Sequence, residues 1–160
     1  MEEDSKIAII GRRKLEGGES IIQEKSLLYA AKKLVILLNE KQFRNDLDGS
    51  VPVLIESENW MGIAEEIDDL FLGDAEVWRR PAIGHAGPSG GDYPLITKEG
   101  HYILDLIFTS PIKSLAEVAE SLKNIDGVVE HGILTNLPCD VLISSDSELR
   151  LVTNFQTKLV

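Results

Sequence analysis

The sequence of 160 residues predicts an α/β protein of two lobes, with the second lobe inserted into the first. Three observations support this fold class. Short apolar runs typical of buried strands stand near both ends of the chain, helical amphipathic patterns stand in its middle, and the polar, turn-rich segment 45–50 separates the two rhythms. The predicted boundaries are residues 1–48 and 135–160 for the first lobe, and residues 49–134 for the inserted lobe.

The first lobe begins with an apolar run at residues 7–10, which ends at Gly11, and continues with a second run at 34–38. Both runs are of the buried-strand type. Between them, Ser20 can cap a helix whose apolar residues recur at helical spacing. Strand, helix and strand in this order predict a parallel unit with the helix as crossover. We expect strands at 141–144 and 149–152 to return to this lobe, which is therefore a partial, Rossmann-like parallel α/β unit.

The inserted lobe alternates strands with two helices. Apolar residues spaced as on one helical face begin at Trp60 and end at Phe71, and Ser114 to Glu117 fit a capping box that opens a second helix. Residues 81–91 are rich in glycine and proline and predict an irregular loop. Strands are expected at 51–56, at 74–80, in a hairpin over 93–108 that turns at 98–100, and from Gly127 onward. The order β-α-β-β-α-β is the ferredoxin-like arrangement of two helices on one antiparallel sheet.

Charge and composition exclude several classes of function. Lys and Arg number 16 against 27 Asp and Glu, and the net charge of −11 would repel a nucleic-acid backbone. No apolar stretch approaches the ~18 residues of a membrane-spanning helix, and the acidic start of the chain is the reverse of a signal or transit peptide. The single cysteine, Cys139, excludes an internal disulfide and favours a reducing compartment. The widely separated His85, His101 and His131 show no metal-binding pattern. These observations predict a soluble intracellular protein with no nucleic-acid, membrane or metal partner.

Three strings, in this order, resemble the type A ribose-5-phosphate isomerase family. Gln23-Glu24-Lys25 is similar to the family's Arg-Glu-Lys, residues 100–105 are close to its Gly-Asn-x-Ile-Leu-Asp, and residues 125–133 nearly reproduce its Ile-x-Gly-Val-Val-Glu-His-Gly-Leu. Residues 64–80 also look like a divergent plant, plastid-type branch. The resemblance covers roughly residues 6–153, and its third string is the most specific.

The resemblance implies an α/β main domain with a β-α-β-β-α-β lid. It implies interconversion of ribose 5-phosphate and ribulose 5-phosphate through an enediolate, in the pentose phosphate pathway and the Calvin cycle, without metal or cofactor. It also implies a homodimer and, for this branch, a chloroplast location. Glu24 matches the glutamate that moves the proton between the two reacting carbons, and Lys41 matches a substrate-binding lysine. Gly17 and Gly18 keep part of a glycine loop that binds substrate, and Lys14 stands one position from the ungapped place of the family's lysine, which is Leu15 here.

One departure from the family pattern stands at the start of the chain. The family's phosphate-holding turn and its Asp-Gly-Ala-Asp-Glu string precede the strand at Ile7, where this sequence has six residues. We therefore expect an N-terminally truncated member or a fragment of a longer precursor. Two alternatives stay open: a non-catalytic paralogue that serves as a small-molecule-binding or dimerisation module, and a structural fragment that exposes apolar strands. For Glu24 and each lysine, the alternative is an ordinary solvated surface charge.

Overall fold

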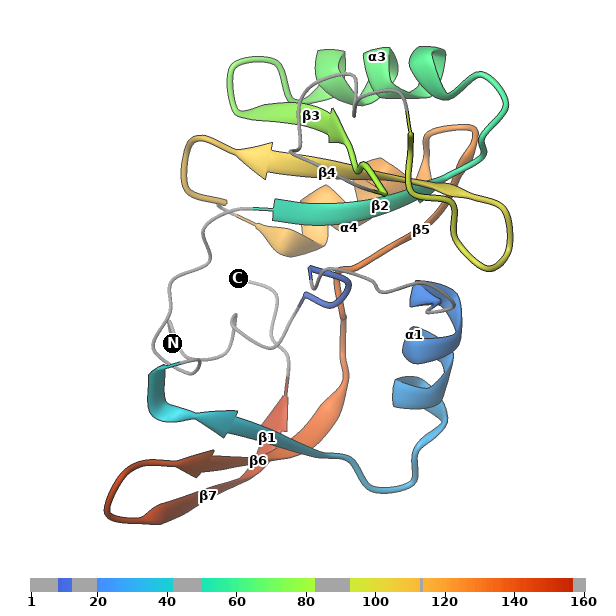
Figure 1. The fold of residues 1–160 in the computed structure, drawn as a ribbon. Coiled ribbons are helices and arrows are strands. Elements are labelled where there is room, and N and C mark those ends of the chain that lie inside the picture. The colour runs from blue at the N-terminus through green and yellow to red at the C-terminus, as the bar shows by residue number, and fades with distance from the viewer. Residues whose placement is uncertain (1–8, 13–19, 42–49, 83–92, 113, 157–160) are drawn as a thin grey trace.

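Two β-sheets, one above the other in Figure 1, organise the chain in the computed structural model. The structure describes residues 9–12, 20–41, 50–82, 93–112 and 114–156. The helices are α1 (Ile21–Ala30), α3 (Trp60–Leu70) and α4 (Leu115–Lys123). The strands are β1 (Val35–Asn39), β2 (Ser50–Ile55), β3 (Ala75–Arg79), β4 (Tyr102–Phe108), β5 (Val128–His131), β6 (Pro138–Ser144) and β7 (Leu149–Gln156).

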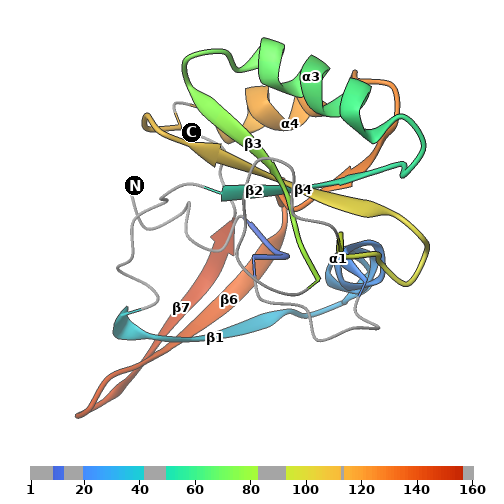
Figure 2. The same cartoon turned by 45° about the horizontal axis from the view of Figure 1, so that its top comes forward.

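The four-stranded sheet has the order β3-β4-β2-β5, and each neighbouring pair is antiparallel. Along the chain its elements follow the predicted order β-α-β-β-α-β. Because the first and second strands of each β-α-β pair are separated by a strand of the other pair, the two units interlock as in a split β-α-β arrangement. Helices α3 and α4 lie together on one face of this sheet (Figure 2).

Both faces of the four-stranded sheet are covered near its centre, so β2 is buried along almost its whole length. On one face, alternate residues of the strands pack against α3 and α4. On the other face, Leu54 and Ile103 pack against Ile21, the first residue of α1. Helix α1 is therefore attached to the sheet of the predicted inserted lobe, whereas the sequence predicted it as a crossover within the first lobe.

The three-stranded sheet has the order β1-β6-β7, in which β1 and β6 are parallel and β6 and β7 antiparallel. The prediction that the last two strands return to the strand after α1 is confirmed. The predicted parallel sheet is mixed, and the described residues of the run 7–10 do not join it. Ile9 instead forms an antiparallel bridge with Ile133, and the Ile10 N–H donates to the Gly132 carbonyl at 2.8 Å.

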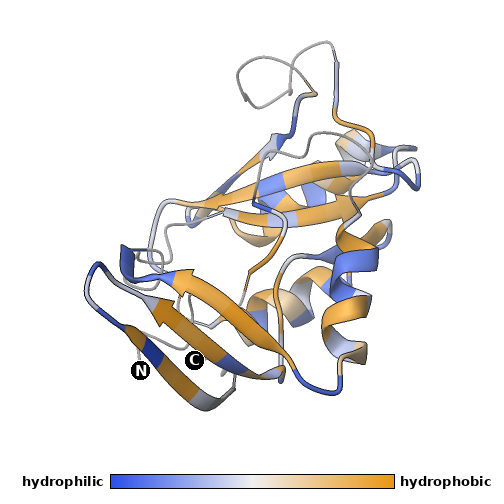
Figure 3. Cartoon of the chain, turned by 60° about the horizontal axis from the view of Figure 1, so that its bottom comes forward, coloured by the Kyte–Doolittle hydropathy of each residue, from blue (hydrophilic) through white to orange (hydrophobic). Residues whose placement is uncertain are grey.

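Burial in the three-stranded sheet is one-sided. Cys139, Val141 and Ile143 are buried with their apolar neighbours on one face. The other face exposes a set of apolar side chains that share the register of the strands: Val35 (45% exposed), Leu37 (71%), Leu149 (70%) and Leu151 (57%). Figure 3 shows how apolar these strands are. The run 34–38 was predicted as a buried strand, and it is only half-buried, on alternate residues, because no described element covers its second face.

Other local predictions are confirmed in part. The turn at 98–100 forms, with Thr97 and His101 paired across it, but the arm before it makes only isolated bridges at Pro94 and Ile96. Ser114 caps α4 by accepting from the Glu117 N–H. Residues 83–92 of the predicted irregular loop lie outside the described residues. None of the described helices is long and apolar enough to cross a membrane.

Candidate functional site

Helix α1 presents the two charged residues of the Gln-Glu-Lys string in different surroundings. Ser20 caps the helix, and its side-chain oxygen accepts from the Gln23 N–H at 3.1 Å. Glu24 follows in the first turn, where a carboxylate interacts favourably with the helix dipole. Its side chain is exposed to solvent, whereas Lys25 is partly buried. Of the two charged side chains in this string, Glu24 therefore faces solvent and Lys25 points into the protein.

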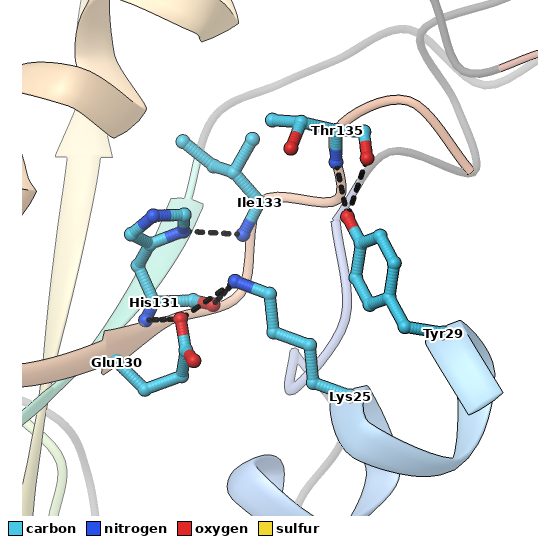
Figure 4. A network of polar contacts seen from close by, with 6 residues as sticks. All are labelled: Lys25, Tyr29, Glu130, His131, Ile133 and Thr135. Atoms are coloured by element: carbon cyan, nitrogen blue, oxygen red, sulfur yellow. Dashed lines mark hydrogen bonds and ion pairs between the residues drawn. The ribbon is translucent and has the colours of Figure 1, made fainter.

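Lys25 joins α1 to β5 through two hydrogen bonds, drawn in Figure 4. Its Nζ donates to Glu130 Oε1 at 2.6 Å and to the His131 carbonyl at 3.0 Å. The side chains of Lys25 and Glu130 are 12% and 29% exposed, so the pair is shielded from solvent and its charge-assisted bonds are strengthened. Burial raises the pKa of Glu130, but the bonds from Lys25 and from the His131 N–H outweigh it, so this pKa lies below its usual value.

His131 lies behind this ion pair and is 1% exposed. Its Nδ1 accepts from the Ile133 N–H at 3.2 Å, so the neutral ring carries its proton on Nε2. Nε2 has no hydrogen-bond partner among the residues that the structure describes. Burial, together with the nearby charge of Lys25, lowers the pKa of His131 to about 4 against the opposing effect of Glu130. The ring is therefore neutral at pH 7.

Tyr29, one helical turn after Lys25, makes a second attachment to the same segment (Figure 4). Its hydroxyl donates to the Thr135 carbonyl at 2.6 Å and accepts from the Thr135 N–H at 2.7 Å. The first and third strings of the sequence are thus joined in space by side chains of α1 that reach the segment 130–135.

The second string contributes to a neighbouring ion pair. Arg80 donates two hydrogen bonds to Asp105, from Nε to Oδ2 at 2.9 Å and from Nη2 to Oδ1 at 2.5 Å. Its Nη1 donates to the Gly11 carbonyl at 2.8 Å. The Ser20 hydroxyl donates to Glu99 at the turn before β4, and this bond lowers the pKa of Glu99. Gly11 and Ser20, which lie on either side of segment 12–19, are therefore bonded to Arg80, directly after β3, and to Glu99, in the turn before β4.

The structure places the sequence-predicted site residues as follows. Glu24 is exposed on α1, and Lys41 is exposed in a helical turn directly after β1. Figures 1 and 2 show α1 and the C-terminal end of β1 on opposite sides of the molecule. Lys14, Gly17 and Gly18 lie outside the described residues. In the described ranges, no group of three or more His, Cys, Asp or Glu side chains is placed to hold a metal ion.

Sequence reasoning assigned no role to Lys25, Glu130, Tyr29 or Arg80, and it gave His131 none. Lys25, Glu130 and His131 stand within two of the three strings, so for them the signal was present in the motifs themselves, whereas Tyr29 and Arg80 lie outside the strings. Their pairing across more than a hundred positions was not readable, because neither periodicity nor spacing shows which distant charges meet.

Comparison with known proteins places this arrangement in a family. The sequence model of the family described as ribose 5-phosphate isomerase A (phosphoriboisomerase A) matches residues 4–148. Ribose-5-phosphate isomerase A of Prochlorococcus marinus (strain MIT 9312) is 30% identical over 129 residues, which are 79% of this chain and 51% of that protein. The chain spans about half the length of the curated relatives it matches.

Two solved structures share the fold. Ribose 5-phosphate isomerase from Plasmodium falciparum gives a TM-score of 0.72 at 28% identity, covering 91% of this chain and 58% of that one. A D-ribose-5-phosphate isomerase in complex with phospho-erythronic acid gives 0.71 at 24% identity, with the same coverage.

Proposed function

The chain belongs to the ribose 5-phosphate isomerase A family, and on that premise we propose that it acts in the interconversion of ribose 5-phosphate and ribulose 5-phosphate, with Glu24 as the group that transfers the proton. The observation that carries this proposal is the different placement of the two charged side chains in Gln23-Glu24-Lys25. Lys25 is partly buried and bonded to Glu130, whereas Glu24 is exposed one residue away on the same capped helical turn. A catalytic carboxylate needs such a placement, accessible to substrate and mounted on a fixed element.

The proposed chemistry is a proton transfer with no net change in atoms. The Glu24 carboxylate takes the proton from carbon 2 of the open-chain aldose, and the electron pair of that C–H bond forms the carbon–carbon double bond of an enediolate. As this double bond forms, the electron pair of the C1 carbonyl moves to O1, and a proton passes from the C2 hydroxyl to O1. The electrons left on O2 then form the C2 carbonyl while Glu24 returns its proton to carbon 1, which gives the ketose. Lys14, Gly17 and Gly18 are proposed to bind substrate oxygens, where cations and backbone N–H groups stabilise the developing negative charge. Lys41 is also proposed as a substrate-binding residue, although the end of β1 that precedes it lies on the opposite side of the molecule from α1. No metal or cofactor is required in this scheme.

Domain organisation, assembly and location are part of the same proposal. We propose that residues 49–134 form the lid and that residues 1–48 and 135–160 form part of the main domain. The exposed apolar face of β1 and β7 supports a homodimer, because contiguous apolar surface favours association. The likeness of residues 64–80 to the plastid-type branch supports a chloroplast location. Sedimentation velocity across a concentration series tests the dimer, and imaging of a fluorescent fusion tests the location.

A coupled assay tests the enzymatic proposal. The purified chain is given ribose 5-phosphate beside its Glu24→Gln variant, and Glu66→Gln on the exposed side of α3 serves as the matched control. We expect activity that is lost in Glu24→Gln and kept in Glu66→Gln. Binding of phospho-erythronic acid, followed by amide chemical shifts of α1, gives a readout independent of turnover. A folded chain that neither turns over nor binds would overturn the proposal in favour of the non-catalytic alternative.

A further inference from the structure

Helix α1 is held mainly by polar bonds. Ile21 is its only fully buried residue, while Leu27 and Tyr29 are 72% and 44% exposed. Apolar packing is therefore strongest in the first turn, and further along the helix Leu28 is half-buried. The attachments further along the helix are the bonds from Lys25 and Tyr29 to segment 130–135.

We propose that Lys25 and Tyr29 are positioning residues, which set the orientation of α1 and thereby of the Glu24 carboxylate. This inference rests on the proposed function, because it gives the attachment a purpose in proton transfer. Two attachments one turn apart, added to the contacts of the first turn, fix both the tilt of a helix and its rotation about its own axis, which the first-turn contacts of Ser20 and Ile21 alone cannot do. Since Glu24 precedes Lys25 directly, any rotation of this turn moves its carboxylate relative to a bound sugar.

The geometry of the Lys25 bonds fits this role. Its ammonium donates to the side chain of Glu130 and to the backbone carbonyl of His131, so the position of the ammonium depends on the position of the β5 backbone. Glu130 also accepts from the His131 N–H at 3.0 Å, which fixes the carboxylate that receives Lys25. The Lys25 contact is therefore made to groups that are already held by the strand, and such pre-arranged support is what a catalytic group on a helix requires.

The experiment compares Lys25→Met with Lys32→Met, an exposed lysine just beyond the same helix. Steady-state kinetics should show kcat of Lys25→Met reduced by roughly 10- to 100-fold with KM nearly unchanged, because a small misplacement of a reacting group has an effect of that order. Lys25→Arg, which can donate to both acceptors, should recover most of the loss. The double variant Lys25→Met/Glu130→Gln should lose no more than Lys25→Met alone, because both changes break one attachment.

Hydrogen exchange separates this inference from the proposed function. In Lys25→Met and in Tyr29→Phe, amides of α1 should exchange faster while amides of β2 and β4 keep their protection. If Glu24→Gln is as active as the wild type, the proposed function fails, and the exchange data still decide whether Lys25 holds α1. If Glu24→Gln is inactive and Lys25→Met keeps the wild-type kcat, the positioning role is overturned. A rise in KM with unchanged kcat would also overturn it and would assign Lys25 to substrate binding.

Discussion

Strands β1 and β2 are both short apolar runs, yet they differ in how completely the protein covers them. β2 is buried on both faces between the α3–α4 layer and Ile21 of α1, whereas β1 exposes every second residue. An apolar run thus specifies a strand, but the elements packed on each face decide its burial. The four-stranded sheet receives α3 and α4 from within its own stretch of sequence and Ile21 from α1, and the described residues supply no such cover to the outer face of the three-stranded sheet.

The largest expected effect comes from one substitution made in both regions. Leu106→Ala removes a fully buried side chain from the centre of the four-stranded sheet, and we expect a loss of about 2–5 kcal/mol in the free energy of unfolding. Leu37→Ala removes a side chain that is 71% exposed in the single chain, and at protein concentrations where the chain is monomeric we expect a change within about 0.5 kcal/mol. Urea unfolding of both variants measures the two changes.

The same pair reveals whether a second copy covers the outer face. If Leu37→Ala is as destabilising as Leu106→Ala at high protein concentration and harmless on dilution, the exposed face is an interface in solution. A cost for Leu37→Ala that is independent of concentration would break the contrast between the two sheets.

Most of the secondary structure was predictable because it depends on local signals. Ser20 and Ser114 mark helix starts, Gly100 allows the turn before β4, and alternation marks the strands of the inserted lobe. Pairing was less predictable. The run at 7–10 has the same apolar character as a parallel strand, but its described residues pair with the segment after β5, because partner choice depends on three-dimensional context that a short run does not encode.

The candidate site divides in the same way. Glu24 was identified by a motif, and the structure places it on an exposed helical turn, which the amphipathic pattern alone did not establish. Lys25 has the same residue type as the surface lysines near it, and its burial follows from Glu130, 105 positions away. A charge becomes recognisable as structural only when its distant partner is known.

The next effect concerns pH at the junction of α1 and β5. The pKa of His131 falls from 6.5 in the unfolded chain to about 4 in the folded protein, so the unfolded state binds the extra proton. The contribution of the neutral His131 ring to the free energy of unfolding is complete above pH 6.5. It is lost as the pH falls from 6.5 to 4, a total of about 3 kcal/mol. Lys25, Glu130 and Lys123 all act on this ring.

Urea unfolding at pH 7, 6, 5 and 4 measures that loss, and NMR titration of the His131 ring measures its pKa directly. His131→Gln should flatten the pH dependence of stability over this range. A measured pKa of His131 at its usual value would show that Nε2 contacts water or a hydrogen-bonding group of the protein. The junction of α1 and β5 would then be open to solvent.

The next comparison is between two glycines with left-handed backbone, whose expected losses of stability differ by about 1–3 kcal/mol. Gly73, after α3, has φ of +84° and open space where a Cβ would stand, so Gly73→Ala should lose only the ~1–2 kcal/mol of that conformation. Gly11 has φ of +85°, and a Cβ there would lie 2.9 Å from Cδ1 of Ile21. Gly11→Ala should add about 1–3 kcal/mol of overpacking against the residue that anchors α1. Thermal unfolding of both variants checks that Gly11→Ala loses more stability than Gly73→Ala. Equal losses would show that the Ile21 side chain moves aside at no cost.

The smallest effect separates the two helix starts. Ser114 and Ser20 each accept from an N–H in the first turn, at 3.3 and 3.1 Å, and replacing either with Ala should remove about 1 kcal/mol of helix stability. Helix α4 buries Leu115, Val118, Ala119 and Leu122 in the core, so Ser114→Ala should lower the global free energy of unfolding. Helix α1 buries only Ile21.

For Ser20→Ala we therefore expect the loss to appear as local opening, with α1 amides exchanging about fivefold faster and the urea midpoint unchanged. The pKa of Glu99 should rise toward its usual value, because the Ser20 hydroxyl is the main cause of its lowering. Ser20→Thr keeps both the cap and the bond to Glu99 and is the matched control. If Ser20→Ala instead shifts the urea midpoint as far as Ser114→Ala does, α1 unfolds together with the four-stranded sheet. The weakly packed helix that carries Glu24 would then be part of the same cooperative unit as the core.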